Sequence, residues 1–244
     1  MSYASPKLQT AELSIVVPCY NEQQTVVKLL DCLREILPDA EIIVVDDAST
    51  DCSLELIREV QSTLDLKVIS LKENGGKGTA VRTGLQSASR GWVVIQDADL
   101  EYDPQDLREM LTAAQQGSLP AVYGSRYLGR GRATGGAVLN FWGVKILALL
   151  SYLLFGKWLT DPHTCYKMVQ RDLMDTLNLR STGFELCAEI NSKLLRHGTP
   201  IVEIPISYQP RDHAAGKKIV LADFFRSALT YLECRFSIDN RTPK

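Results

Sequence analysis

The stretch VVIQDADLEYDP, residues 93–104, decides how this sequence folds. Its apolar start is typical of a buried strand, and it ends abruptly at Asp97 and Asp99, with Glu101 two residues later. In an open α/β sheet, ligands bind outside the carboxyl ends of the strands. Carboxylates gathered at such an end repel one another and gain little from burial. The pattern therefore predicts a ligand site at this strand end.

A divalent cation would relieve that repulsion. Mg²⁺ and Mn²⁺ take hard oxygen ligands and commonly bridge one or two carboxylates to substrate phosphates. The alternative is that these acids cap the helix predicted after Pro104, because Asp is favoured at helix starts. Asp103 fits that role, whereas Asp97 and Asp99 lie too far upstream. We therefore expect these two residues to hold Mg²⁺ or Mn²⁺ beside a phosphate.

Length and composition are those of an ordinary globular protein. The 244 residues suffice for one large α/β domain and are few for two independent ones. A formal net charge of −2 gives no reason to expect nucleic-acid binding. The six cysteines form no CxxC pair and no zinc-like spacing, so we expect reduced thiols of a cytoplasmic protein. Residues 1–12 lack the apolar core of a signal peptide.

Short apolar runs alternate with amphipathic stretches through the first half of the chain. Strands are predicted over residues 13–17, 41–45, 66–71, 92–96 and 121–124, and helices over about 21–37, 51–63, 79–88 and 105–116. This alternation predicts a mostly parallel sheet with helices on both faces. Right-handed crossovers place every strand end on one edge of such a sheet. The segments expected to converge on one crevice there are 18–22, 46–47, 75–78 and 97–101.

The second half of the chain has a different pattern. A helix is predicted near residues 184–197, and a strand over 201–208 in which Pro205 indicates a sheet edge or a bulge. A basic loop, 211–218, precedes a last helix at about 221–236. No linker or repeat separates the halves, so we expect an elaboration of the same domain.

Residues 138–159, VLNFWGVKILALLSYLLFGKWL, are apolar but carry Lys145 well inside the segment. A membrane-spanning helix needs about 20 predominantly apolar residues. One interpretation is a helix buried in the core. The other is a helix lying in a membrane interface, with Trp142, Tyr152 and Trp158 at the level of the lipid headgroups. The segment alone does not favour either.

Two common nucleotide-binding motifs are excluded by spacing. A dinucleotide-binding fold needs G-x-G-x-x-G after its first strand, where this chain has PCYNE at 18–22. A P-loop needs G-x-x-x-x-G-K-[ST], but here Gly78 follows Lys77 and the required upstream glycine is Leu71. What remains is a nucleotide held by the ends of several strands, with its diphosphate on the metal.

Three side chains at the expected sheet edge are candidates for the nucleoside. Asp47 would face a base or ribose from the end of the second strand, and Glu22 can accept a hydrogen bond from a ribose hydroxyl. Lys77 follows two glycines that let the backbone approach closely, and it can reach a base, a ribose or a phosphate. The alternatives are that Asp47 is a turn residue and Lys77 a solvated loop lysine. Their shared edge favours the binding role for all three.

Several segments carry a family resemblance. Those that resemble the nucleotide-sugar half of glycosyltransferase family 2 are SIVVPCYNE at 14–22, EIIVVDDASTD at 41–51, NGGKGTAVRTG at 74–84 and QDADLEYDP at 96–104. Those that resemble a subgroup, the transferases that charge a polyprenyl or dolichyl phosphate with a sugar, are VYGSRY at 122–127, DPHTCYKM at 161–168, GFELCAEI at 183–190, PISYQPR at 205–211 and GKKI at 216–219. The resemblance covers about residues 13–236.

This resemblance implies a GT-A fold, a Rossmann-like α/β sheet with a C-terminal elaboration on the acceptor side. The whole chain, 1–244, would be one domain, with a nucleotide-sugar half at about 13–125 and an acceptor and membrane-proximal half at about 126–236. The implied activity is an inverting, metal-dependent transfer from a UDP- or GDP-linked sugar to a polyprenyl phosphate. The implied place is peripheral, on the cytoplasmic face of a membrane, with a separate membrane partner or a second copy of the chain as candidate partners.

The resemblance also implies roles for single residues. Asp99 would be the principal metal ligand, with Asp97 beside it, and Glu101 a third ligand where the subgroup often has glutamine. The catalytic residues would be Asp97, Asp99 and Arg126. The contacts to the nucleotide sugar would be Pro18, Tyr20, Glu22, Asp47, Lys77, Asp97, Ala98 and Asp99.

Loops near the apolar segment supply cations for an anionic acceptor. Arg126, Arg211 and Lys217 are the candidates for its phosphate, and arginine suits bidentate contact with phosphate. The alternative, ordinary solvated charges, suits Arg130 and Arg132 better. A phosphate monoester is already ionised at neutral pH, so it needs no strong general base.

A hydroxyl acceptor, by contrast, needs a positioned carboxylate. Asp161 and Glu185 are the candidates for such a base, although Asp161 before Pro162 can also be a turn residue. Three alternatives therefore stay open: a family 2 transferase with a hydroxyl acceptor, a non-catalytic nucleotide-sugar-binding protein, and a nucleotidyltransferase. The last usually has a glycine-rich loop after its first strand, which this sequence lacks.

Overall fold

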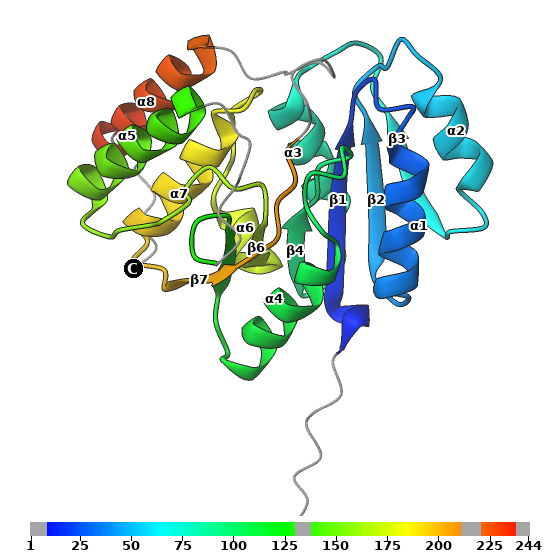
Figure 1. Cartoon of the computed structure of the whole chain (residues 1–244), viewed down its shortest axis with the longest axis horizontal. Helices are drawn as coiled ribbons and strands as arrows, with labels where there is room; N and C mark the ends of the chain where they lie inside the picture. Colours follow the sequence, from blue (N-terminus) through cyan, green and yellow to red (C-terminus); the bar gives the residue numbers. More distant parts are fainter. Residues whose placement is uncertain (1–8, 130–137, 211–220, 238–244) are drawn as a thin grey trace, which may run out of the picture.

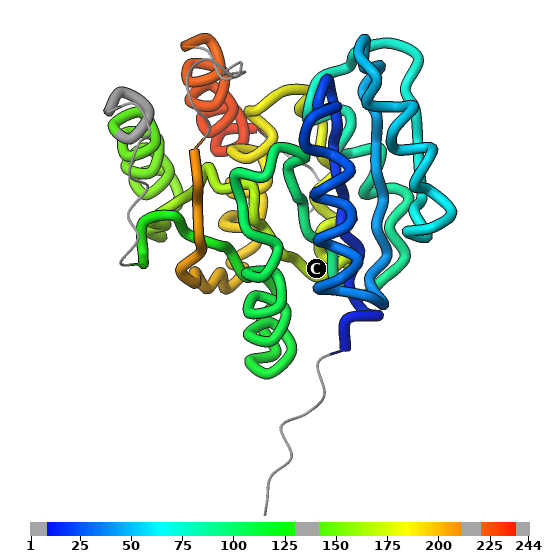
Figure 2. The backbone as a smooth tube through the Cα atoms, turned by 45° about the vertical axis from the view of Figure 1, so that its right-hand side comes forward, coloured from blue at the N-terminus to red at the C-terminus, as the bar shows by residue number. Residues whose placement is uncertain are grey.

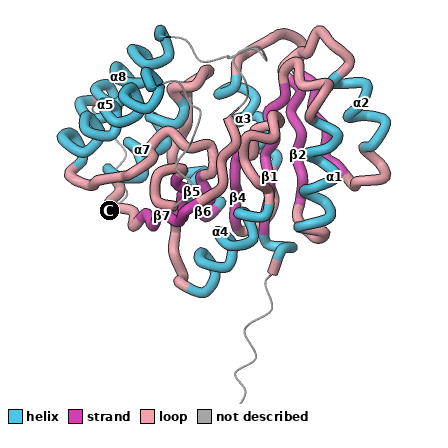
Figure 3. Tube along the Cα trace, viewed as in Figure 1, coloured by secondary structure: helices cyan, strands magenta, loops and turns pink. Residues whose placement is uncertain are grey.

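A twisted sheet forms the centre of the molecule, and helices surround it (Figures 1 and 3). The structure, a computed structural model, describes residues 9–129, 138–210 and 221–237. In that part of the chain the sheet has seven strands in the order β3-β2-β1-β4-β6-β5-β7. The strands are β1 Leu13–Cys19, β2 Glu41–Asp46, β3 Leu66–Ser70, β4 Trp92–Ile95, β5 Ala121–Ser125, β6 Lys167–Gln170 and β7 Ile201–Pro205.

Most neighbouring strands in the sheet are parallel, as the alternation of elements predicts. β1 pairs in parallel with β2 and β4, β2 with β3, and β5 with β7. β6 is the exception, because it runs antiparallel between β4 and β5. The sequence did not predict β6 or the short α6, Arg171–Thr176, which follows it. Pro205 ends β7 on the edge of the sheet, in agreement with the expectation for that proline.

Helices cover both faces of the sheet. They are α1 Val26–Ile36, α2 Ser53–Val60, α3 Lys77–Ser87, α4 Gln105–Gln116, α5 Val138–Phe155, α7 Leu186–Arg196 and α8 Leu221–Phe236. The connections through α1 and α2 lead along the sheet from β1 to β3, whereas the connection through α3 leads back from β3 to β4. Right-handed crossovers therefore put α1 and α2 on one face of the sheet and α3 on the other. α1 begins later than the predicted residue 21, because Glu22 and Thr25 form a turn before its first helical residue.

A small residue lets α3 lie close to the sheet. A Cβ atom at Gly84 would come within 2.4 Å of the Cγ1 atom of Val16 on β1. Glycine therefore permits a helix–strand approach that a larger residue would prevent. This approach fixes α3, and with it Lys77 at its start, against β1 and β2.

α5, α7 and α8 pack together beside the sheet (Figures 1 and 2). A second core, built on the buried side chains of Leu147, Ala188 and Tyr231, joins them. Within the described residues, no helix has both the length and the apolar character needed to cross a membrane. α5 is also no simple core helix, because Trp142 and Leu153 are 60% and 71% exposed.

The outward sides of α5 and α8 carry exposed apolar residues at helical spacing, which we call the apolar stripes. The stripe of α5 is Trp142, Ile146, Leu149 and Leu153, and that of α8 is Leu221, Phe225, Leu229, Leu232 and Phe236. Steps of three and four residues place each set on one side of its helix. The segment 138–159 thus has an inner face in the second core and an outer apolar face.

Candidate active site

The loops that follow β1 and β2 interlock at the carboxyl edge of the sheet. The backbone N–H of Asp47 donates to the carbonyl oxygen of Cys19 at 2.8 Å. The N–H of Asn21 donates to the hydroxyl of Ser49 at 3.0 Å, and the N–H of Glu22 to that of Ser53 at 2.8 Å. The loops expected to converge here therefore do so.

Asp47 shapes the glycine loop after β3. Its carboxylate accepts hydrogen bonds from the N–H groups of Gly75 at 2.7 Å and Gly76 at 2.9 Å, and the residue is only 3% exposed. Burial raises the pKa of Asp47, while the two N–H donors oppose that rise. Gly76 has a φ of +85°, which favours glycine. Asp47 is thus more than a turn residue, because it orders the segment that leads to Lys77.

The first N–H groups of α3 are bound by another segment of the same chain. The carbonyl oxygen of Thr182 accepts hydrogen bonds from the N–H groups of Gly78 at 2.7 Å and Thr79 at 3.2 Å. A Cβ atom at Gly78 would lie 2.5 Å from the carbonyl oxygen of Ser181. The glycines do permit a close backbone approach, as expected, but the group that approaches is the segment before α7.

Lys77 forms an ion pair with the first acid of the Asp-x-Asp pattern. Its Nζ lies 2.6 Å from Oδ1 of Asp97, 3.8 Å from the Sγ of Cys165 and 5.3 Å from the ring centroid of Phe184. Burial alone would lower the pKa of Lys77, but the carboxylate of Asp97 raises it above its ordinary value. The alternative of a solvated loop lysine is therefore wrong.

The loop from Asp97 to Asp103 is held by its own hydrogen bonds. Oδ1 of Asp99 accepts from the N–H of Glu101 at 3.1 Å, across Leu100 with a φ of +61°. Oδ1 of Asp103 accepts from the N–H of Gln105 at 2.9 Å, which confirms Asp103 as a cap at the start of α4. Capping of α4 is thus explained by Asp103 alone, and Asp97 and Asp99 are not needed for it.

The donor chemistry of this loop fits a hard divalent cation. Asp97 and Asp99 supply carboxylate oxygens, which Mg²⁺ and Mn²⁺ prefer. Oε2 of Glu101 instead accepts a hydrogen bond from the hydroxyl of Tyr208 at 2.7 Å. In the described ranges, no group of three or more His, Cys, Asp or Glu is arranged to hold a metal ion. Asp97 and Asp99 are therefore the residues of this loop that could hold such a cation.

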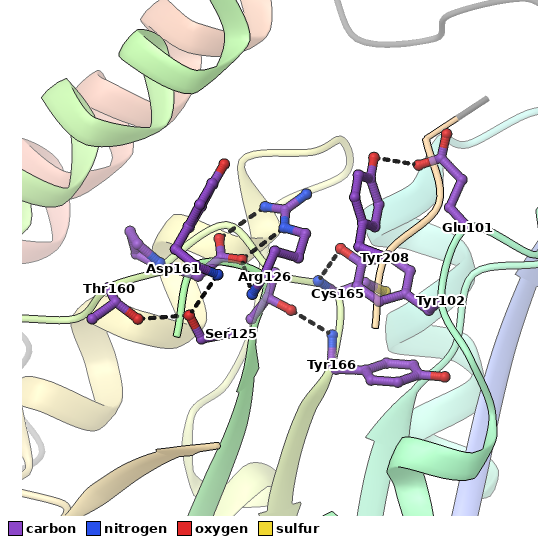
Figure 4. A network of polar contacts seen from close by, with 12 residues as sticks. Glu101, Tyr102, Ser125, Arg126, Thr160, Asp161, Cys165, Tyr166 and Tyr208 are labelled. Atoms are coloured by element: carbon purple, nitrogen blue, oxygen red, sulfur yellow. Dashed lines mark hydrogen bonds and ion pairs between the residues drawn. The ribbon is translucent and has the colours of Figure 1, made fainter. Parts of the chain in front are cut away.

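Arg126 and Asp161 form a bidentate ion pair near the end of β5 (Figure 4). Nε of Arg126 lies 2.6 Å from Oδ2 of Asp161, and Nη2 lies 2.8 Å from Oδ1. Asp161 is completely buried. Burial raises the pKa of Asp161, but the guanidinium outweighs that effect and holds the pKa below its ordinary value. The two charges are therefore fixed in one geometry.

A carboxylate on β7 holds the segment that carries Asp161. Glu203 accepts hydrogen bonds from the N–H groups of Thr160 at 2.7 Å and Asp161 at 2.9 Å. The hydroxyl of Thr160 also contacts that of Ser125 at 2.6 Å. Sequence reasoning missed Glu203, although an acid in the middle of an apolar strand was a signal that could have marked it.

Three tyrosines lie near the guanidinium of Arg126, and Figure 4 shows two of them, Tyr102 and Tyr208. Its central carbon lies 5.1 Å from the ring centroid of Tyr208, 5.7 Å from that of Tyr127 and 6.0 Å from that of Tyr102. Tyr102 and Tyr208 also form an isolated antiparallel bridge, which joins the acidic loop to the segment after β7. The sequence analysis did not identify these aromatic contacts, because they join distant segments.

The remaining predicted residues have varied positions. Glu22 is nearly buried and accepts a hydrogen bond from Thr25, whose hydroxyl also lies 2.8 Å from the carbonyl oxygen of Ala98. Pro18 and Tyr20 are half-buried at the end of β1. The predicted cations outside the described residues are Arg130, Arg132, Arg211 and Lys217.

Solved structures with the same architecture include glucosyl-3-phosphoglycerate synthase from Mycobacterium tuberculosis in complex with Mn²⁺, UDP and phosphoglyceric acid. The TM-score is 0.67 at 20% identity, covering 96% of this chain and 82% of that one. A second structure of that enzyme, with Mn²⁺ and UDP-glucose, gives a TM-score of 0.68. This likeness establishes the GT-A fold.

Curated relatives include a dolichol-phosphate mannosyltransferase of Pyrococcus furiosus, 28% identical over 215 residues, which are 84% of this chain and 59% of the relative. An undecaprenyl-phosphate 4-deoxy-4-formamido-L-arabinose transferase of Pseudomonas fluorescens is 27% identical over 216 residues, 84% of this chain and 59% of the relative. A polyprenol monophosphomannose synthase of Mycolicibacterium smegmatis is 26% identical over 221 residues, 85% of this chain and 81% of the relative. The chain thus spans only 59% of the length of the first two relatives.

The family model for glycosyl transferase family 2 matches residues 14–177, more than half of the 244-residue chain. The match includes the interlocked loops of β1 and β2, the Lys77–Asp97 ion pair and the Arg126–Asp161 ion pair. The chain therefore belongs to glycosyl transferase family 2.

Proposed function

We propose that this protein transfers a sugar, with inversion, from a nucleotide-diphosphate sugar to a polyprenyl phosphate. The observation that carries the proposal is the contact between the ion-pair site and the apolar helix. Lys145 of α5 donates a hydrogen bond to the carbonyl oxygen of Thr160, next to Asp161, at 3.2 Å. A charged site for a phosphate thus adjoins the exposed apolar stripes that suit its isoprenoid chain. The relatives named for dolichyl, undecaprenyl and polyprenol phosphates support this acceptor class.

The donor would lie at the carboxyl edge of β1, β2 and β4. There Glu22 and Asp47 would contact the nucleoside, and Lys77 a ribose or phosphate. Pro18, Tyr20 and Ala98 would contribute backbone and apolar contacts. The donor would be either a uridine or a guanosine nucleotide, and the residues named here do not select between the two bases.

Asp99, with Asp97 beside it, would hold Mg²⁺ or Mn²⁺. A bound divalent cation would neutralise the charge that develops on the leaving diphosphate. The Mn²⁺ in the structure of glucosyl-3-phosphoglycerate synthase supports a divalent ion for this fold. Lys77 would then exchange its contact with Asp97 for a contact with the nucleotide. Glu101 as a third ligand stays a prediction; its Oε2 accepts a hydrogen bond from Tyr208, so its other oxygen, Oε1, would be the ligand.

The contacts of the two candidate bases, Asp161 and Glu185, favour a phosphate acceptor over a hydroxyl acceptor. Asp161 is bound to Arg126 and its pKa is lowered, so it is a weak base. Oε1 of Glu185 accepts from the N–H groups of Thr182 and Gly183, so this carboxylate is held by the turn before α7. A phosphate acceptor needs neither residue, because it arrives ionised. Its oxygen would attack the anomeric carbon opposite the leaving diphosphate.

The apolar stripes would rest on the surface of a membrane. Exposed apolar residues at helical spacing, with aromatic residues among them, are typical of helices that lie in the interface plane. The protein would then meet its lipid acceptor at this surface. We propose this peripheral position as part of the function.

The test is an assay of the purified protein with a panel of radiolabelled UDP- and GDP-sugars and Mn²⁺, with and without polyprenyl phosphate. We expect label in the organic phase only when the lipid phosphate and one donor are both present. Transfer to a water-soluble hydroxyl acceptor instead would support the alternative transferase. Absence of turnover with every donor would contradict catalysis and favour a nucleotide-sugar-binding protein.

A further inference from the structure

Lys145 is the cation that interrupts the most apolar helix of the chain. It lies between Val144 and Ile146 on α5, next to the exposed apolar stripe. A charge in such a place is costly unless it has a polar partner or reaches solvent. The proposed function uses the contact of Lys145 with Thr160 to join the helix to the ion-pair site, but it gives the charge of Lys145 no role of its own.

The side chain of Lys145 points at the ion-pair site. Its Nζ donates to the carbonyl oxygen of Thr160 at 3.2 Å and lies 4.3 Å from the ring centroid of Tyr127. The guanidinium carbon of Arg126 lies 5.7 Å from the centroid of the same ring. Two cations, one from the end of β5 and one from α5, therefore meet at Tyr127.

Two acids, Asp161 and Glu203, lie close to this pair of cations and are engaged by other groups of the chain. Asp161 is completely buried and bound to Arg126 through both carboxylate oxygens. Glu203 is engaged by Thr160 and by the N–H of Asp161. Burial lowers the pKa of Lys145, and both carboxylates oppose that effect. Asp161 thus fixes the guanidinium of Arg126, and Glu203 fixes the segment whose Thr160 carbonyl oxygen binds Lys145.

We propose that Lys145 and Arg126 together bind the phosphate of the lipid acceptor, with Lys145 delivering its charge from the helix that contacts the isoprenoid chain. The inference rests on the proposed function and adds a residue to it. An ammonium is a compact charge on a flexible apolar stem. The stem of Lys145 can follow the apolar surface of α5 while its Nζ meets the headgroup. The recognised ligand is a phosphate monoester that carries an apolar chain.

The test compares Lys145→Gln with Lys145→Arg and with Lys157→Gln, a control in the same apolar segment. The apparent KM values for polyprenyl phosphate in phosphatidylcholine vesicles and for the sugar nucleotide are measured separately. We expect Lys145→Gln to raise the KM for the lipid phosphate about ten- to a hundredfold, as for loss of a charged hydrogen bond. The KM for the donor should stay unchanged. Lys145→Arg should retain most of the lipid affinity, and Lys157→Gln all of it.

A purely structural role for Lys145 would produce a different result. Loss of its bond to Thr160 would then lower the melting temperature and raise both KM values together. That outcome, or an unchanged KM for the lipid phosphate in Lys145→Gln, overturns the inference. Failure of the proposed function is distinguishable, because the unaltered protein would then transfer no sugar to polyprenyl phosphate at all.

Discussion

The carboxylate of Asp99 can be altered without disturbing its loop. Asparagine keeps an oxygen that can accept the hydrogen bond from the N–H of Glu101, but it loses the negative charge. If Asp99 anchors the metal, Asp99→Asn should lower kcat/KM for sugar transfer by about a hundredfold or more. The measurement is an initial-rate assay over a range of Mn²⁺ concentrations. Gln105→Glu at the exposed start of α4 serves as a control for expression and folding.

Undiminished turnover of Asp99→Asn, with the same Mn²⁺ dependence, would contradict the metal assignment. A loss of activity with a lowered melting temperature would point to a role in the loop instead. The two results separate because the hydrogen bond to Glu101 is preserved in the variant.

The Arg126–Asp161 pair makes a prediction about stability. Asp161→Asn leaves the guanidinium in its enclosed position without a counter-charge, so we expect the free energy of unfolding to fall by about 3–5 kcal/mol. Urea denaturation measures this loss. In the double variant Arg126→Gln/Asp161→Asn the loss should be smaller than the sum of the two single losses. Additive losses would show that the two charges do not stabilise each other.

For single residues, the sequence predicts where in the fold a side chain lies better than it predicts which residue that side chain contacts. The pattern around Asp97 and Asp99 and the shared strand edge correctly placed Lys77 beside the acids. Asp161, in contrast, was interpreted as a turn residue or a base, and its partner Arg126 as a phosphate ligand. An ion pair between residues 35 positions apart in the sequence, with α5 between them, has no local signature. The contact exists because the chain returns to the sheet after α5.

Among the elements, the apolar stripes carry a prediction about membranes. Phe225 and Leu229 are 58% and 57% exposed, so the double change Phe225→Ser/Leu229→Ser should leave the melting temperature nearly unchanged. Binding to vesicles should weaken about tenfold, because the variant lacks two apolar side chains that would be partly buried in the membrane surface. Co-sedimentation with phosphatidylcholine vesicles measures it.

Val202→Ser is the matched control for the vesicle experiment. Val202 is an exposed apolar residue on β7, outside both stripes, and 38% of it is accessible. The Val202→Ser variant should bind vesicles as strongly as the unaltered protein. If the double variant in α8 also binds as well as the control, α8 is not part of a membrane contact.

Long amphipathic elements were the most predictable part of the fold. The predicted helices over 105–116 and about 221–236 agree with α4 and α8, and Gly198 ends α7 with a φ of +68°, as expected for a helix C-terminus. β6 was missed because its four residues have no period of their own. Their pairing depends on β4 and β5, which the folded sheet brings to either side.

For the whole molecule, half-buried His163 predicts how stability depends on pH. Burial, with the nearby charge of Lys167, lowers the pKa of His163 to about 3, while an unfolded histidine has about 6.5. Between these values the unfolded chain binds a proton that the folded chain does not. The free energy of unfolding should therefore fall as pH falls, with His163 contributing a loss of about 2 kcal/mol between pH 6.5 and pH 5.

Urea denaturation at pH 7, 6 and 5, with His163→Phe as the comparison, isolates this contribution. The variant lacks the titrating ring but keeps an aromatic group against Tyr231, whose ring lies 6.0 Å away. As pH is lowered, the unaltered protein should lose stability relative to the His163→Phe variant, which lacks this titration. An equal pH dependence in both would mean that His163 takes up a proton in the folded state.

The antiparallel strand β6 has a consequence for any attempt to recombine this enzyme. β5 has its two neighbours, β6 and β7, in the part of the chain that follows residue 125. A fragment cut after β5 would therefore contain a strand with nothing to pair with, and β4 would keep an open edge that invites aggregation. The part of the chain after residue 125 is thus not a unit that can be exchanged at that residue. A working chimera has to bring in β6 and preserve the pairing of Trp92 with Gln170 and Val93 with Val169.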